Sequence, residues 1–191
     1  MRRLLFVSNL FPDSNQPIRG LDNATLLHAM RADWEIRVLS PRATLKPWQS
    51  NHLTAREQDE IFSPLYVNFV YLPKIGSWCN DHFMEFFLAS SFVRIIREFK
   101  PDAVLCSWLY PDGCAVARLA RQHGVPLVLV TQGSDTHGYL KFPVRRRKII
   151  SAIHSSGATI CRSANLAHRL HDAGAEKDKH KVIYNGVDTK I

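Results

Sequence analysis

The sequence has 191 residues, enough for one large domain with its own core, and its 46% hydrophobic and 22% charged residues are ordinary for a globular protein. Lys and Arg number 25 against 17 Asp and Glu, and the net charge of +8 either favours an anionic partner (phosphorylated substrate, acidic lipid or nucleic acid) or only aids solubility. No stretch approaches the roughly 18 apolar residues of a membrane-spanning helix, and the apolar run 4–7 is too short for the core of a signal peptide.

Short apolar runs alternate with helical patterns along the chain. Residues 4–7 predict a buried strand that is followed by a polar loop over residues 9–22. Apolar residues at helical spacing predict helices around Leu26 and over residues 81–100. Further strands are predicted at residues 35–40, 66–72, 103–107, 127–131, 158–161 and 181–184.

Residues 41–64 are polar and mixed, and their pattern predicts no definite element. In the second half of the chain, Asp112 and Ser163 are predicted to cap the N-termini of two helices. Gly124 and Gly174 are predicted to end these helices, because glycine readily adopts the left-handed conformation found there.

Cysteine and histidine form no disulfide or metal-binding pattern. None of the four cysteines belongs to a C-x-x-C pair, and Cys106 and Cys161 lie in apolar runs, which indicates reduced, buried thiols of a cytosolic protein. His168 and His171 are three residues apart, but no carboxylate or thiol is placed to complete a metal site with them.

Strands that alternate with helices indicate βαβ units. The predicted fold class is therefore α/β, a Rossmann-like parallel sheet with helices on both faces. The strands are apolar throughout, as strands buried on both faces are. The last strand runs into the turn Asn185-Gly186-Val187-Asp188, which predicts one domain over residues 1–184 and the start of an interdomain hinge over residues 185–191.

Ligands of open parallel sheets bind outside the carboxyl ends of the strands, and the loop after the first strand has such a place. Gly20 precedes a predicted helix and lets backbone amides approach an anion, and Arg19 is suited to pair with a phosphate. The alternative is a flexible turn without a ligand, because the loop lacks a complete G-x-G-x-x-G pattern.

Two other loops follow predicted strand ends. Trp108 and Tyr110 are expected to line a cleft and pack on sugar rings, although Trp108 is equally suited to cap the core. The segment from Thr131 to Gly138 is the most polar strand end. In this segment Gly133 allows close approach of a ligand to the backbone.

Gln132 and Asp135 of the same segment offer acceptors for sugar hydroxyls. The alternative is that Ser134 and Asp135 only cap the following turn. We expect the turns at Gly20, Gly133 and Asn185 to lie along one edge of the sheet and to form half of a groove.

The basic run 145–148 has three possible explanations. It is either a solvated helix end or a contact with anionic lipid, with Phe142 and Ile149 as apolar anchors. Binding of nucleic acid is disfavoured, because the run is short and no signature of a nucleic-acid-binding module accompanies it.

Three long segments together carry a family resemblance, and they occur in the family's order. They are LLFVSNLFPDSNQPIRG, PDAVLCSWLYPDGCAVARLARQHGVPLVLVTQGSD and ATICRSANLAHRLHDAGAEKDKHKVIYNGVDTKI. They resemble the N-terminal domain of family-four retaining glycosyltransferases, which have the GT-B architecture. The resemblance covers nearly the whole chain, and VIYNGVD is its most specific piece.

The resemblance implies two Rossmann-like domains that face each other across a cleft. The N-terminal domain holds mainly the acceptor, and the C-terminal domain binds the nucleotide sugar. Transfer retains the anomeric configuration and needs neither a metal ion nor another cofactor. Together with this resemblance, the positive charge and the polar strand-end loops favour polysaccharide or glycolipid biosynthesis in the cytoplasm, with a glycan or lipid-linked acceptor and with contact at the inner face of the membrane. Without the C-terminal domain, the 191 residues are expected to be inactive.

Site residues follow from the resemblance by position. Gly20 is expected near the donor phosphates, and Gln132, Gly133 and Asp135 beside the acceptor and the reacting sugar. Asn185–Gly186 would form the hinge at the floor of the cleft. The family commonly has His where this chain has Gln132, and because Gln is no proton acceptor at neutral pH, a hydrogen bond to a hydroxyl is the expected role.

Two other functions remain open at this point. A sugar-nucleotide 2-epimerase shares the two-domain architecture but lacks the NGVD pattern, and a stand-alone Rossmann-like binding module would have no catalysis. A flavin or nicotinamide protein is disfavoured, because no G-x-G-x-x-G follows the first strand.

Overall fold

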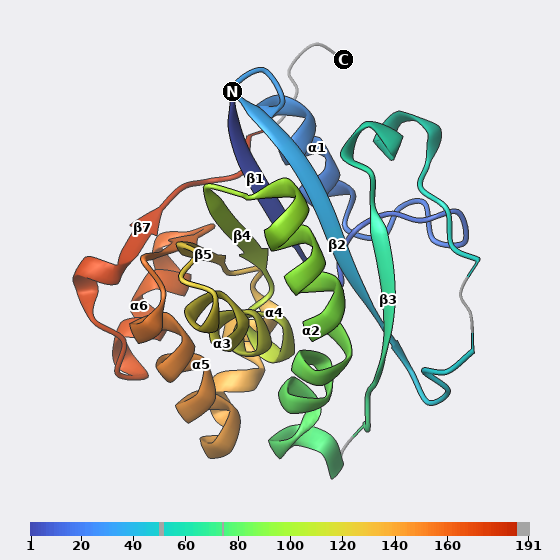
Figure 1. Ribbon diagram of the computed structural model, residues 1–191. Helices are drawn as coiled ribbons and strands as arrows, with labels where there is room; N and C mark the ends of the chain where they lie inside the picture. Colours follow the sequence, from blue (N-terminus) through green and yellow to red (C-terminus); the bar gives the residue numbers. More distant parts are fainter. Residues whose placement is uncertain (50–51, 74, 187–191) are drawn as a thin grey trace.

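The computed structural model describes residues 1–49, 52–73 and 75–186 (Figure 1). Within these residues, seven strands form one sheet in the order β3-β2-β1-β4-β5-β6-β7, and every neighbouring pair is parallel. The strands are β1 (Arg2–Val7), β2 (Trp34–Thr44), β3 (Leu65–Val70), β4 (Ala103–Ser107), β5 (Leu127–Val130), β6 (Ala158–Cys161) and β7 (His180–Val182).

Helices connect these strands. The described helices are α1 (Leu21–Met30), α2 (Asn80–Phe99), α3 (Cys114–Gln122), α4 (Ser134–His137), α5 (Pro143–Ser155) and α6 (Ala164–Asp172). Shorter turns of helix are η1 (Glu57–Phe62), η2 (Ile75–Trp78), η3 (Leu109–Gly113), η4 (Tyr139–Lys141) and η5 (Lys177–Lys179). In chain order, β1, β2 and β3 form one side of the sheet. Helix α2 then connects β3 to β4, which pairs with the other side of β1.

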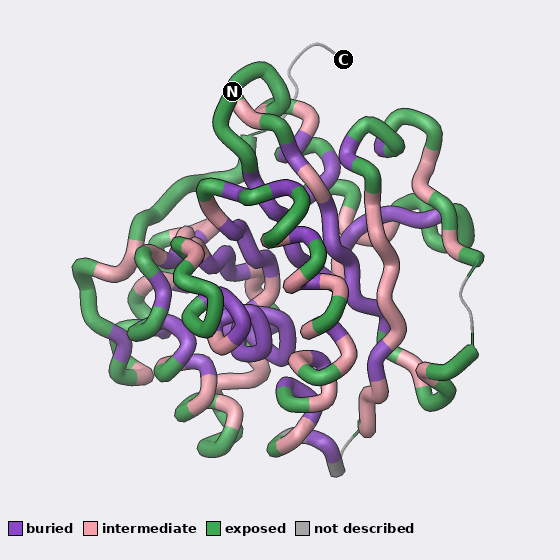
Figure 2. The backbone as a smooth tube through the Cα atoms, in the orientation of Figure 1, coloured by how far each residue is buried: buried purple, intermediate pink, exposed green. Residues whose placement is uncertain are grey.

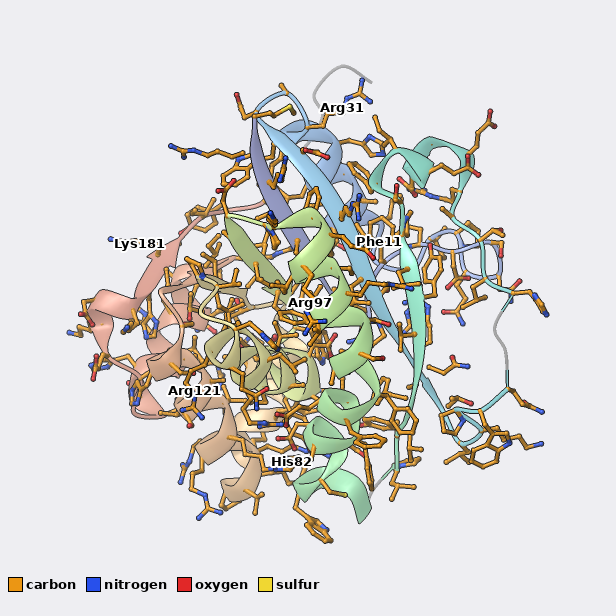
Figure 3. All side chains as sticks on the ribbon, viewed as in Figure 1. Phe11, Arg31, His82, Arg97, Arg121 and Lys181 are labelled. Atoms are coloured by element: carbon orange, nitrogen blue, oxygen red, sulfur yellow. The ribbon has the colours of Figure 1, made fainter. Side chains whose placement is uncertain are left out.

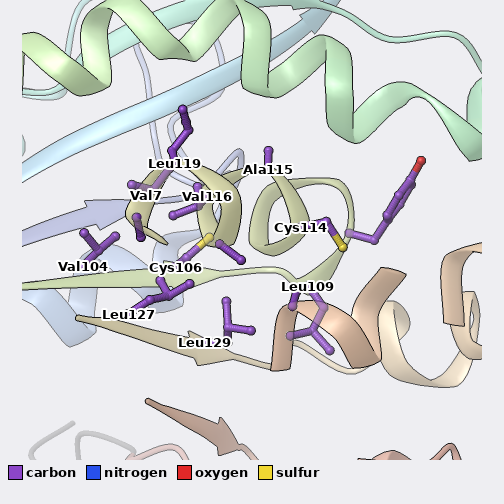
Figure 4. Close-up of a cluster of buried hydrophobic side chains, with 14 of the residues drawn as sticks. Val7, Val104, Cys106, Leu109, Cys114, Ala115, Val116, Leu119, Leu127 and Leu129 are labelled. Atoms are coloured by element: carbon purple, nitrogen blue, oxygen red, sulfur yellow. The ribbon is translucent and has the colours of Figure 1, made fainter. Parts of the chain in front are cut away.

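The sheet is covered on both faces, as predicted. Successive residues of β1 alternate between two apolar cores, with Leu5 on one face and Phe6 on the other. The larger core contains residues of α2, α3, α5 and α6, and Figure 4 shows its part around α3. The smaller core contains residues of α1 and η1. In Figure 2 the buried positions lie mainly in the central strands and in α3.

The predicted strands are all present, although the bounds of several differ from the predicted ones. The second strand was expected over residues 35–40, but β2 continues to Thr44. Pro41 is tolerated because β1 pairs with β2 only as far as Leu39, so the missing N–H removes no bond to β1. The last strand, expected over residues 181–184, is β7 and ends at Val182.

One predicted helix cap is confirmed and one is wrong. The Oγ of Ser163 accepts a hydrogen bond from the backbone N–H of Leu166 at 3.3 Å at the start of α6. Asp112 was expected to cap the helix that is α3, but its carboxylate accepts from the backbone N–H of Asn9 at 2.6 Å and from its side-chain amide. A distant partner thus replaces the local cap.

The parallel sheet determines where the predicted turns lie. All strands point the same way, so every loop that follows a strand leaves at the same carboxyl edge. The turns at Gly20, Gly133 and Asn185 follow β1, β5 and β7, which confirms that they belong to one edge. The rest of the predicted hinge motif, Val187 and Asp188, lies outside the described residues.

Candidate functional site

The loop after β1 is held by a buried arginine that the sequence did not reveal as important. The guanidinium of Arg42, on β2, donates to the backbone oxygens of Phe11 at 2.7 Å and Asn9 at 3.1 Å. It also pairs with Asp13 at 2.9 Å and donates to the Oγ of Ser40. Burial lowers the pKa of Arg42, and the charge of Asp13 opposes this. A cation inside an apolar strand is the sequence signal that could have identified it.

Gly20 and Arg19 also hold this loop in place. Gly20 has φ +63°, and a Cβ at this position would lie 2.3 Å from the carbonyl carbon and oxygen of Leu10. The loop therefore requires glycine for close backbone contact as well as for its φ. The guanidinium of Arg19 donates to the backbone oxygen of Asn9 at 2.8 Å and to the side chain of Gln16 at 2.9 Å. Arg19 also borders a polar hollow of about 240 Å³ that lies over β2 and β3.

Gln132 follows β5 and is fixed by neighbours from two other elements. Its Nε2 donates to the Oδ1 of Asn23 at 2.9 Å and to the Oγ of Ser107 at the end of β4. Asn23 is fully buried on α1, and its Oδ1 also accepts from the guanidinium of Arg162 at 2.9 Å. Among the described residues, the Oε1 of Gln132 has no hydrogen-bond partner, so it can accept a hydrogen bond from a ligand hydroxyl.

Asp135 shapes the loops around Gln132 and is itself fully buried. Its carboxylate accepts from the backbone N–H of Gln132 at 3.0 Å, of Gly133 at 2.9 Å and of Leu109 at 3.0 Å. Burial raises the pKa of Asp135, and these amides oppose the rise. The carboxylate thus joins the loop after β5 to the loop after β4.

The backbone next to Asp135 is open. Gly133 has φ +112°, and no atom lies within 4 Å of the position that a Cβ would take. Ser134 is exposed at the start of α4. This part of the edge can therefore admit a ligand to the backbone of Gly133.

Aromatic rings surround a small pocket beside these loops. Trp108 contacts Tyr139 edge to face, with ring centroids 6.1 Å apart. The backbone of Trp108 has φ +90°, a conformation that costs about 1–3 kcal/mol and that the surrounding contacts must maintain. The pocket of about 150 Å³ is lined by Asn9, Ala43, Phe69, Tyr71, Trp108, Pro111, Asp112 and Tyr139.

The expectation that Tyr110 lines the cleft is wrong. Its side chain is fully buried, and its hydroxyl donates to the backbone oxygen of Gly76 at 3.3 Å. The apolar core takes this ring because Leu109 and Tyr110 turn inward between β4 and α3. Trp108 is thus the aromatic residue of this segment that lines the pocket.

Asp112 supplies a carboxyl group to the same pocket. It is fully buried, and burial raises its pKa to about 7, although the hydrogen bonds from Asn9 favour the charged form. A carboxyl group with this pKa can exchange a proton near neutral pH.

Asn185 and Gly186 form no hydrogen bond with these loops in the part of the chain that the structure describes. Both residues are exposed, and within the described part of the chain they take part in no hydrogen bond or ion pair. At this edge, Asn9 and Trp108 line one pocket, and Asp135 connects the loop of Trp108 to Gln132. The hinge role of Asn185 and Gly186 stays a prediction.

The basic run is divided between internal contacts and the surface. The guanidinium of Arg145 lies over the ring of Tyr139 at 4.6 Å, and Lys148 pairs with Asp81 at 2.6 Å. Ile149 was expected to be an apolar anchor for lipid, but it is fully buried on the inner face of α5, so that expectation is wrong. Phe142 is 52% exposed.

Metal binding and membrane spanning can be examined on the described residues. Within residues 1–49, 52–73 and 75–186, no three His, Cys, Asp or Glu side chains lie together as potential metal ligands. None of the helices described there has the length and apolarity needed to cross a bilayer.

Comparison with protein families gives one match. Residues 24–191 match Glycosyltransferase Family 4. Arg19 and Gly20 lie outside the matched residues. No curated protein matches the sequence.

Several solved structures share this fold. Anabaena HepE in complex with UDP-glucose aligns with a TM-score of 0.59 at 16% identity, over 98% of this chain and 45% of that chain. The UDP-N-acetylglucosamine 2-epimerase of Rickettsia bellii gives 0.60 at 12% identity, over 95% and 44%. The UDP-GlcNAc 2-epimerase of Neisseria meningitidis bound to UDP-GlcNAc gives 0.57 at 15% identity, over 97% and 47%. At these identities the likeness shows the fold, and this chain spans less than half the length of each of these proteins.

Proposed function

Because this chain belongs to glycosyltransferase family 4, we propose that it forms the acceptor side of a retaining glycosyltransferase that uses a nucleotide sugar. One observation carries this proposal. The amide of Gln132 is fixed by Asn23 and Ser107, and its Oε1 has no hydrogen-bond partner among the residues that the structure describes. Ser107 directly precedes Trp108, which lines the aromatic pocket. A hydrogen-bond acceptor and an aromatic pocket at the same edge of the sheet suit a sugar, whose ring packs on aromatic faces and whose hydroxyls donate hydrogen bonds.

Each residue of the edge has a proposed role. Gln132 accepts a hydrogen bond from a hydroxyl of the acceptor or of the reacting sugar, and Trp108 packs against a sugar ring. Asp135 is a positioning residue, because its buried carboxylate contacts the backbone of Gln132 and Gly133. Gly133 and Ser134 offer open backbone and an exposed hydroxyl beside this position.

The donor is proposed to be a nucleotide sugar held mainly by a second Rossmann-like domain. HepE binds UDP-glucose and the Neisseria epimerase binds UDP-GlcNAc, and each protein is about twice the length of this chain. Gly20 directly precedes α1, and the N-terminus of this helix has the positive potential that suits a phosphate. Asn185 and Gly186 would connect the two domains. We place this activity in the cytoplasm, in polysaccharide or glycolipid synthesis.

A sugar-nucleotide 2-epimerase is the second candidate, since the TM-scores of 0.60 to the Rickettsia epimerase and 0.59 to HepE are nearly the same. The family match favours the transferase, because it is to a glycosyltransferase family and covers residues 24–191. The two candidates differ in product, since an epimerase changes the donor sugar at C2 and needs no acceptor.

The test compares this chain with the longest open reading frame that contains it. Both proteins are incubated with radiolabelled UDP-sugars and glycan or lipid-linked acceptors, and the products are separated by chromatography. We expect transfer by the longer protein and none by the 191 residues. Transfer by the 191 residues alone would refute the need for a second domain, and an epimerised donor without transfer would refute the transferase.

Substitution of Gln132 tests the site itself. Gln132→Met keeps the size of the side chain and removes its hydrogen bonds. In the longer protein we expect kcat/KM for sugar transfer to fall by about 10- to 100-fold, because one or two hydrogen bonds near the reacting groups are lost. Gln122→Met is the matched control, because Gln122 is exposed at the end of α3. Equal kcat/KM for the Gln132 variant and the control would contradict the proposed role.

A further inference from the structure

The positive charge of the protein is concentrated in one part of the chain. Between Asp135 and Asp172 no acidic residue occurs, and this interval contains seven basic residues of a protein whose net charge is +8. They are Lys141, Arg145, Arg146, Arg147, Lys148, Arg162 and Arg169. Most of them lie on α5 or just before it.

Internal contacts occupy three of these cations and leave others on the surface. Arg145 lies over the ring of Tyr139, Lys148 pairs with Asp81, and Arg162 pairs with Asp22. Within the described part of the chain, the exposed residues of the same segment form no ion pair. They are Lys141, Arg146, Arg147 and Arg169.

A groove between α2, α3 and α5 continues this surface. Its volume is about 350 Å³, and small side chains such as Ala117 and Ser151 line it together with several cations. The nearby carboxylates are already paired, since Asp81 contacts both Arg118 at 2.9 Å and Lys148 at 2.6 Å. Arg121 and Arg147 are exposed at the groove and add positive charge without a carboxylate partner among the described residues.

Exposed apolar side chains adjoin these cations. Trp78 is 63% exposed, Phe86 76% and Phe142 52%, and they lie at or near the N-terminal ends of α2 and α5. The two helix ends are in contact, because the Nζ of Lys148 donates to the backbone oxygen of Trp78 at 2.6 Å. Figure 1 shows both ends at the lower side of the molecule, and Figure 3 labels His82 there.

We propose that this surface, formed by Trp78, Phe86, Phe142, Arg146 and Arg147, docks on an anionic lipid bilayer. Aromatic side chains enter the headgroup layer, and the arginines pair with lipid phosphates. In an anionic bilayer, negatively charged headgroups cover an apolar layer of acyl chains. A surface that combines cations with protruding aromatic side chains fits both layers. A nucleic acid would instead favour rings arranged as a stacking platform along a basic groove.

The docking surface is coupled to the candidate site by position. Helices α2 and α5 begin at the carboxyl edge of the sheet, because each follows the carboxyl end of a strand. Tyr139 lines the aromatic pocket on one side and contacts Arg145 of α5 on the other. Docking would therefore turn the edge that contains Trp108 towards the lipid, which deepens the proposed function by favouring a lipid-linked acceptor.

Vesicle binding by the 191-residue protein tests the docking surface without any sugar transfer, so its failure is separate from failure of the proposed function. Vesicles of phosphatidylcholine alone are compared with vesicles of equal parts phosphatidylcholine and phosphatidylglycerol in a sedimentation assay. We expect binding to the mixed vesicles only, and weaker binding as salt increases.

Charge and aromatic variants identify the surface. Arg146→Gln with Arg147→Gln should weaken binding by about 25-fold, from about fivefold for each cation near an anionic bilayer. Phe86→Ser should weaken it further. The matched control, Arg94→Gln with Arg97→Gln, removes two exposed charges from the C-terminal half of α2 and should change binding little. Circular dichroism confirms that each variant is folded.

Several results would overturn the proposal. They are equal binding to both vesicles, unchanged binding by the Arg146 and Arg147 double variant, an equal loss in the control, and displacement by inorganic phosphate at the concentration of lipid phosphate. Equally tight binding to an RNA oligonucleotide, lost in the same double variant, would indicate a general polyanion site and would also reject it.

Discussion

Asp112 should make the domain lose stability as pH rises through neutrality. Burial raises its pKa from 3.8 to about 7, so the folded state binds the proton more tightly than the unfolded state. The stabilisation by this proton is complete below the unfolded pKa and is lost as pH rises through the folded pKa. Between about pH 5 and about pH 8, this one group should lower the free energy of unfolding by about 2.5 kcal/mol.

Asp112→Asn should remove this dependence, because an amide does not ionise and resembles the protonated carboxyl in shape. Urea unfolding of both proteins at the two pH values gives the change in each free energy of unfolding. The wild-type protein should lose about 2.5 kcal/mol more than the variant between those pH values. The matched control is Asp178→Asn, which removes an exposed carboxyl on η5. If the wild-type protein and the Asp112 variant change equally with pH, Asp112 is not the buried acid described above.

Two further predictions concern the loop after β1. Gly20→Ala places a methyl group 2.3 Å from the carbonyl group of Leu10 and should cost about 2–4 kcal/mol in urea unfolding. Gly124→Ala has a similar φ of +66° but no atom within 4 Å, so it should cost only about 1 kcal/mol, and equal losses would contradict the close contact. Arg42→Met leaves the carboxylate of Asp13 buried without a cation and should cost about 3–5 kcal/mol. Adding Asp13→Asn should restore part of this stability, and a further loss would argue against the pair.

The fold was predictable because its strands are buried on both faces. Apolar runs such as residues 103–107 and 127–131 mark such strands without reference to any distant residue. The end of β2 was not predictable in this way. A proline such as Pro41 usually indicates the end of a strand. Only the structure shows that β1 pairs with β2 no further than Leu39, so that Pro41 costs no hydrogen bond to β1.

The site was predictable in its location but not in its internal contacts. The rule for parallel sheets places Gly20, Trp108 and Gln132 at one edge without any knowledge of their partners. The roles of Asp112 and Arg42 depend on residues far away in the sequence, since Asn9 is 103 residues from Asp112. A capping rule that uses only neighbouring residues therefore gave the wrong partner for Asp112.

The neighbours of Gln132 offer a physical reason for its difference from the histidine expected in this family. The Nδ2 of Asn23 donates to the backbone oxygen of Leu10 at 2.8 Å, which fixes Oδ1 of Asn23 as an acceptor. The Oγ of Ser107 donates its single hydrogen to that same Oδ1 at 3.2 Å. Towards Gln132, the Ser107 oxygen can therefore only accept a hydrogen bond. The amide of Gln132 supplies two N–H groups to these two oxygens and still presents a carbonyl oxygen. A neutral histidine has a single N–H and could replace only one of these two hydrogen bonds of Gln132, whereas a charged one would have no acceptor for a hydroxyl. Glutamine is thus the residue that satisfies Asn23 and Ser107 while keeping an acceptor for a ligand.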